Sequence, residues 1–139
     1  MSLQIEVLRL KPGDDLRHAL ARVLGAPHLV AQDLQAASIV SAVGSLSQAV
    51  LRYAAEPGGS VLAGPLELIS LSGTLSADGV HLHASVSDAS GVMRGGHVMP
   101  GCIVRTTAEL VIALLPGWSF RRALDADTGY LELNVLRRL

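Results

Sequence analysis

The fold is decided by residues 64–109, GPLELISLSGTLSADGVHLHASVSDASGVMRGGHVMPGCIVRTTAE, in which strand patterns and turn signals follow one another. Within residues 79–87 two histidines, His81 and His83, alternate with the apolar side chains Leu82, Ala84 and Val86. Successive side chains of a strand point to opposite faces, so both imidazoles are predicted to share one polar face, with Cα atoms about 6.7 Å apart at ~3.3 Å per residue.

A third histidine, His97, follows this strand after a turn signal at Asp88–Gly91. A hairpin at that turn would bring residues 92–98 back beside the histidine strand, and His97 would then join the other two. Three neutral imidazoles with an open fourth position are typical of a catalytic zinc site. The alternative is a solvated or hydrogen-bonded histidine pair on a strand surface, which is a common arrangement.

Length and composition indicate a single domain that spans residues 1–139. Half of the residues are hydrophobic but only 3% are aromatic, which favours a core of aliphatic side chains packed between strands and a helix. Because the mean hydropathy is positive, we expect surplus apolar surface to form a subunit interface. No apolar run approaches the ~20 residues of a membrane span, and the N-terminus lacks the pattern of a signal peptide.

Cysteine content and charge limit the classes of protein further. The single cysteine, Cys102, permits no internal disulfide and is predicted to be a small buried side chain, so we expect a cytoplasmic protein. The net charge is −1, whereas a dedicated DNA-binding domain is usually basic or carries a basic surface stripe. The only basic clusters are two dibasic pairs, interpreted as solvated surface: Arg121 with Arg122, and Arg137 with Arg138.

The order of elements predicts an α+β fold with a mostly antiparallel sheet of about seven strands. A strand over residues 4–10 precedes one main helix, which Asp14 or Asp15 caps and which Gly25 and Pro27 close. Strands follow, with predicted breaks at Gly44–Ser45 and over residues 56–59. Residues 103–115 are β-branched and bracketed by Pro-Gly pairs, which favours a strand; a hairpin with a turn at residues 127–129 ends the chain.

Five segments of the sequence resemble those of a known family: SAVGSLSQAVLRYA, GPLELISLSGTLS, DGVHLHASVSD, GGHVMPGCIVRTTAEL and FRRALDADTGYLEL. Together they resemble the plant and prokaryote conserved (PPC) domain over nearly the whole chain. The resemblance implies a β-α-β start, a homotrimer and a family description as DNA-binding. In plant members DNA contact is attributed to a separate AT-hook of Arg-Gly-Arg-Pro type, and the sequence contains no such segment.

The family fold is also similar to that of acetolactate decarboxylase and other zinc proteins that use a His-x-His with a distal histidine. That similarity maps Zn²⁺, or another divalent metal, to His81, His83 and His97. Three further residues are candidates for polar support: Glu67, Arg105 and Glu109. Either carboxylate would serve as a fourth ligand or as a base, with Arg105 as a charge partner. The alternative is that these residues form structural ion pairs at the seam of the trimer.

Three functions are therefore weighed. The first is a homotrimeric DNA-binding or regulatory PPC-domain protein with a histidine metal site, the second a zinc-dependent hydrolase or lyase, and the third a module for assembly alone. The missing AT-hook and the near-neutral charge count against DNA, and the lack of an evident base counts against an enzyme. The sequence assigns no catalytic and no nucleic-acid-binding residue.

Overall fold

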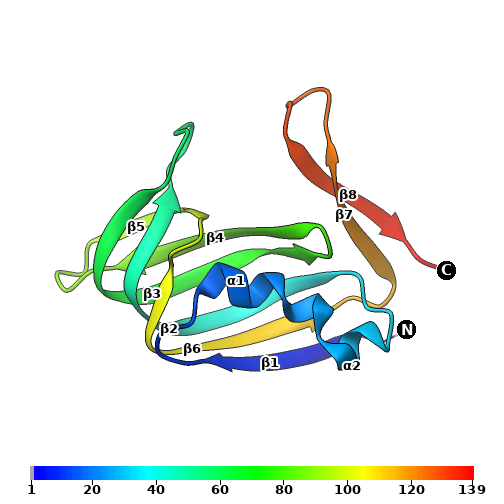
Figure 1. The fold of residues 1–139 in the computed structure, drawn as a ribbon, viewed down its shortest axis with the longest axis horizontal. Helices are drawn as coiled ribbons and strands as arrows, with labels where there is room; N and C mark the ends of the chain where they lie inside the picture. Colours follow the sequence, from blue (N-terminus) through cyan, green and yellow to red (C-terminus); the bar gives the residue numbers. More distant parts are fainter. Residues whose placement is uncertain (1) are drawn as a thin grey trace.

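The computed structural model describes residues 2–139 as eight strands and three short helical segments, one strand more than expected (Figure 1). Six strands form one sheet in the order β1-β6-β2-β3-β4-β5, and every pairing is antiparallel, which confirms the mostly antiparallel prediction. The last two strands form a separate two-stranded sheet. The strands are β1 (Gln4–Leu10), β2 (Ala37–Arg52), β3 (Ser60–Ser76), β4 (Gly79–Ser87), β5 (Met93–Val98), β6 (Ile103–Leu114), β7 (Trp118–Leu124) and β8 (Leu131–Arg137).

The main predicted helix is present as α1 (Leu16–Ala21) followed by a 3-10 turn, η1 (Val23–Gly25), and it ends at Gly25, as predicted. A separate short helix, α2 (Pro27–Val30), follows. Asp15 caps α1 by accepting a hydrogen bond from the His18 amide at 2.9 Å. Pro27 lacks an amide proton and therefore suits the first turn of α2, where that proton would have no partner within the helix. The expected apolar positions are buried against the sheet: Leu16, Leu20, Val23 and Leu24.

Strand β2 is continuous, so the turn predicted at Gly44–Ser45 is wrong. Gly44 is needed there because the backbone of β6 comes very close: an added Cβ would overlap the Thr107 carbonyl oxygen and lie 2.7 Å from Ala108 Cα. A glycine in a strand can mark such a close approach as well as a turn. The unbroken strand is long enough to pair with three neighbours, namely β3, β6 and β5.

The far end of β2 closes part of the sheet on itself. Leu51 pairs with Val98 and Arg52 pairs with His97, so strands β2, β3, β4 and β5 form a closed ring of pairings. Gly96 permits this closure, since an added Cβ there would lie 2.7 Å from the Arg52 carbonyl oxygen. The core is aliphatic, as predicted, and Cys102 is part of it. A helix long and apolar enough to cross a membrane is not found among residues 2–139.

The hairpin of β7 and β8 projects away from the large sheet (Figure 1). Its base is fixed to the body: Phe120 is buried, Ser119 Oγ donates to Gln35 Oε1 at 2.8 Å, and Arg138 forms an ion pair with Asp33. Near its tip the apolar side chains Leu124, Tyr130 and Leu131 are each at least 65% exposed. The predicted hairpin is confirmed, and one of its faces borders the site described next.

Candidate metal centre

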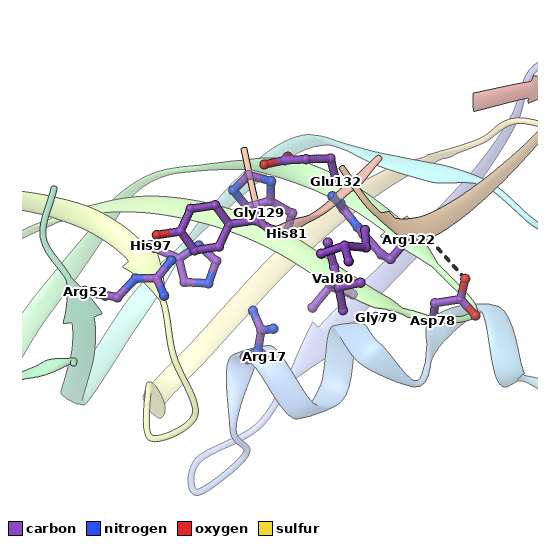
Figure 2. A pocket seen from close by; sticks show the side chains of 13 residues that line it. Arg17, Arg52, Asp78, Gly79, Val80, His81, His97, Arg122, Gly129 and Glu132 are labelled. Atoms are coloured by element: carbon purple, nitrogen blue, oxygen red, sulfur yellow. Dashed lines mark hydrogen bonds between the residues drawn. The ribbon is translucent and has the colours of Figure 1, made fainter. Parts of the chain in front are cut away.

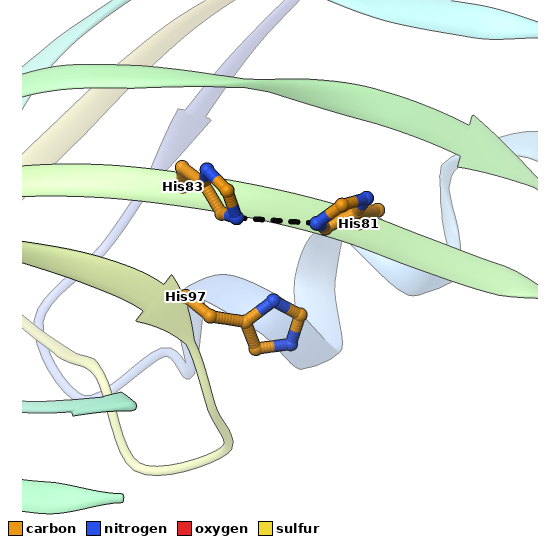
Figure 3. A group of neighbouring side chains, drawn as sticks. All are labelled: His81, His83 and His97. Atoms are coloured by element: carbon orange, nitrogen blue, oxygen red, sulfur yellow. Dashed lines mark hydrogen bonds between the residues drawn. The ribbon is translucent and has the colours of Figure 1, made fainter. Parts of the chain in front are cut away.

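The three candidate histidines lie together on neighbouring strands (Figure 3). His81 and His83 point outward from β4 while Leu82 and Ala84 on the same strand are buried, which confirms the predicted alternation. His97 on β5 is the register partner of His83, as the predicted hairpin requires. Cross-strand partners share a face of the sheet, so all three rings meet on the outside of the closed ring of strands.

The spacing of the ring nitrogens fits a single metal ion. His81 Nε2 and His83 Nε2 are 3.1 Å apart, and one nitrogen from each of the three rings lies within 4.8 Å of the others. Tetrahedral zinc with Zn–N bonds of about 2.0–2.1 Å places neighbouring nitrogens about 3.3 Å apart. The donor set therefore fits Zn²⁺ or another divalent metal that accepts imidazole.

The electrostatic surroundings keep two of the rings neutral, which is the form that ligates metal. Burial, followed by the nearby positive charges of Arg52 and Arg17, lowers the pKa of His97 from 6.5 to about 4. Burial also lowers the pKa of His81, and proximity to His83 and Arg122 adds to that effect. Both rings are thus unprotonated at neutral pH.

The structure does not bring the three proposed supporting residues to this cluster. Glu67 is an exposed residue of β3 in register with Ser87, four positions beyond His83 along β4. Arg105 and Glu109 are exposed on β6, which is separated from β4 and β5 by other strands. Within residues 2–139 none of these three side chains forms an ion pair inside the chain.

The residues that do surround the cluster come from distant parts of the chain. A cleft of about 620 Å³ next to His81 and His97 is lined by three arginines and by one wall of the C-terminal hairpin (Figure 2). Arg122, expected to be solvated surface, is one of the three; the others are Arg17 and Arg52. No spacing in the sequence points to this set, because its members lie on α1, β2 and β7.

Comparison with known proteins places this geometry in context. The family model described as the Plants and Prokaryotes Conserved (PCC) domain matches residues 1–116. A Synechococcus protein named bifunctional protein GlmU is 51% identical over 134 residues, which are 96% of this chain and 20% of the relative. The chain thus spans about a fifth of the length of that curated relative.

Solved structures with the same fold include two with substantial identity. A hypothetical protein from Salmonella is 45% identical with a TM-score of 0.90, and the match covers 99% of this chain and 96% of that one. A protein from Archaeoglobus fulgidus, described as metal-containing, is 28% identical with a TM-score of 0.76 over 93% and 91% of the two chains. A Ralstonia eutropha protein that carries the name of a candidate DNA-binding protein is 19% identical with a TM-score of 0.77 over 92% and 89%, a likeness that shows the fold alone.

Proposed function

Because the chain belongs to the Plants and Prokaryotes Conserved domain family, we propose that it is a metal-binding member of that family. His81, His83 and His97 would hold one divalent ion, with Zn²⁺ as the first candidate. The observation that carries this proposal is the convergence of three outward-facing imidazoles from two paired strands. A relative at 28% identity that is described as metal-containing adds support. When bound, Zn²⁺ supplies a Lewis acid to whatever enters the neighbouring cleft.

Metal analysis of the purified protein tests the proposal directly. Plasma mass spectrometry after reconstitution at neutral pH should find about one equivalent of zinc, nickel or iron per chain. His83→Ala should remove most of it, because two imidazoles bind far more weakly than three. His28→Ala is the matched control, since His28 is exposed and faces Glu6 on another part of the surface. Less than a tenth of an equivalent in the unaltered protein would return the cluster to a hydrogen-bonded surface group.

The same proposal includes assembly as a homotrimer. Five aliphatic side chains on β1, β2 and β3 are between 49% and 68% exposed: Ile5, Val7, Val40, Val43 and Ile69. On β1, Ile5 and Val7 alternate with Leu8 and Leu10, which face the core, so Ile5 and Val7 lie on the uncovered face of the sheet. Such surface is stabilised by about 25 cal/mol per Å² when it is removed from water. We therefore expect chains to associate through this face.

A role in DNA binding or regulation is the second candidate, and the names of distant family members favour it. The chain itself offers little attraction for a polyanion, because its net charge is −1. Any contact with duplex DNA would therefore depend on local arginine clusters. A hydrolase or lyase reaction gains no support from Glu67 or Glu109, which lie away from the histidines.

A further inference from the structure

The cleft beside the histidine cluster gathers positive charge from three separate elements. Arg17 comes from α1, Arg52 from the end of β2 and Arg122 from β7, and all three line the same cleft as His81 and His97 (Figure 2). We propose that this cleft binds a small organic anion by its carboxylate or phosphate group, with the three arginines as its receptors. The inference rests in part on the proposed metal site, which would be the second point of attachment.

Each arginine is held beside one particular histidine. Arg52 is the register partner of His97, so the two side chains share a face. Arg17 donates a hydrogen bond to the carbonyl oxygen of Val98, the residue after His97, at 3.0 Å. Arg122 donates to Thr74 Oγ1 at 2.9 Å, and Thr74 is the register partner of His81. Backbone register and hydrogen bonds therefore place each of the three arginines near one of the histidines that line the cleft.

The positive charge in the cleft is not neutralised by the protein. Within residues 2–139 none of the three arginines forms an ion pair. Asp78 lies in the cleft, but its carboxylate accepts from the Arg121 side chain at 3.2 Å and from the Arg122 amide at 3.1 Å. Glu132 is the remaining carboxylate of the lining and accepts from Thr128 Oγ1 at 3.2 Å. The cleft thus contains three guanidinium groups and one carboxylate that is not engaged by a cation. An anionic ligand would neutralise part of the remaining positive charge.

The donors that remain suit an oxyanion. A guanidinium carries five N–H donors in a planar fork that matches the two oxygens of a carboxylate or phosphate. Arg17 and Arg122 each use one bond to the protein, which fixes their orientation and leaves other donors free. The pKa of Arg17 is lowered, chiefly by burial, with Arg122 and Arg52 contributing against the favourable effect of Asp15. Such crowding of like charges is relieved when an anion binds between them.

The size of the cleft indicates a small ligand. Its volume of about 620 Å³ falls within the roughly 300–1,000 Å³ of ordinary small-molecule pockets. Leu124, Tyr130 and Leu131 of the hairpin add apolar side chains to its lining. A nucleic acid would need a basic track along its backbone, whereas these arginines line a single compact cleft. A ligand with an acidic head group and a short organic body fits best.

Isothermal titration calorimetry on the full chain tests the proposal with two probes, inorganic phosphate and acetate, at constant ionic strength. At least one probe should bind at one site per chain with millimolar affinity or better. Arg52→Gln should weaken that binding at least tenfold, and Arg122→Gln serves if the first variant does not fold. Arg94→Gln is the matched control, because Arg94 is an exposed residue of β5 that does not line this cleft. The stronger probe then distinguishes a phosphate from a carboxylate ligand.

Failure of this inference and failure of the metal site give different results. If metal is absent but a probe still binds in a way that depends on Arg52, the anion site stands without the metal. If metal binds at one equivalent but neither probe binds, the anion site is overturned. It is equally overturned if Arg94→Gln weakens binding as much as Arg52→Gln does, since the effect would then come from general surface charge.

Discussion

At the scale of single residues, the neighbours of His97 decide how the cluster responds to pH. The ring is partly buried and lies in register with Arg52, while Arg17 is held at the adjacent carbonyl of Val98. Burial, followed by these positive charges, disfavours an imidazolium, which is why the pKa of His97 falls to about 4. The same arginines would repel the metal, so the imidazoles must bind it strongly enough to overcome that repulsion.

Metal affinity is therefore expected to decrease as the pH falls and to decrease most steeply near pH 4. Protons compete with the metal for each ring nitrogen. Because the pKa values of His81 and His97 are lowered, protons displace the metal from these two rings only at pH values below 6.5. A competition titration against a chromophoric chelator between pH 7.5 and pH 4 measures this dependence. An affinity that stays constant over the whole range would mean that the metal is not held by imidazoles.

At the scale of elements, the site depends on the pairing of β5 with the end of β2. This pairing sets His97 beside Arg52 and opposite His83. It is possible because Gly96 leaves room for the Arg52 backbone, whose carbonyl oxygen would lie 2.7 Å from an added Cβ. The carbonyl belongs to a strand and cannot rotate away as a flexible side chain would.

Gly96→Ala should consequently lower the free energy of unfolding by about 1–3 kcal/mol, the usual cost of forcing extra volume into a packed structure. The metal affinity should fall with it, since β5 would shift away from β2 and carry His97 along. Chemical denaturation and metal titration measure the two effects. Gly58→Ala is the control, because an added Cβ there meets nothing within 4 Å. Equal stability of the two variants would show that the closure of the strands is looser than described.

At the scale of the whole molecule, the uncovered face of β1, β2 and β3 is the basis of the proposed trimer. Val7 and Val43 on this face are 68% and 58% exposed in the single chain. Exposed aliphatic side chains spread over adjacent strands make a patch that soluble monomers rarely leave open. The proposed trimer would cover it.

Light scattering should accordingly give a mass three times the 14.5 kDa of one chain at micromolar concentration. Val43→Glu should dissociate the assembly, because three buried carboxylates would have to give up their hydration. Val30→Glu on α2 should leave the mass unchanged, although Val30 is similarly exposed at 59%. A monomer in the unaltered protein would contradict the proposal.

The net charge of the whole molecule decides how strongly it would bind DNA. With a net charge of −1 the chain can neutralise few phosphates, so we expect weak, non-specific binding. That binding should disappear between about 50 and 200 mM salt, because counterion release is its main driving force. Fluorescence anisotropy with a labelled duplex gives the measurement. A sequence-specific complex that survives at physiological salt would show that the assembled surface presents charge differently from the single chain.

The sequence by itself determined those features that depend on neighbours along the chain. Alternation with period two placed His81 and His83 on one face, and the turn signal at Asp88–Gly91 returned His97 to them. The family resemblance is likewise confirmed. Local signals failed at Gly44, which resembles a turn residue but instead accommodates the backbone of β6.

Only the tertiary structure decided which charged residues surround the histidines. Arg17, Arg52 and Arg122 meet because the far end of β2 pairs with β5 and because β7 leads back past β3. Periodicity reports which face of an element a side chain occupies, but it does not report which elements become neighbours. That choice depends on long-range strand pairing and on burial of a shared core, which no window of the sequence contains.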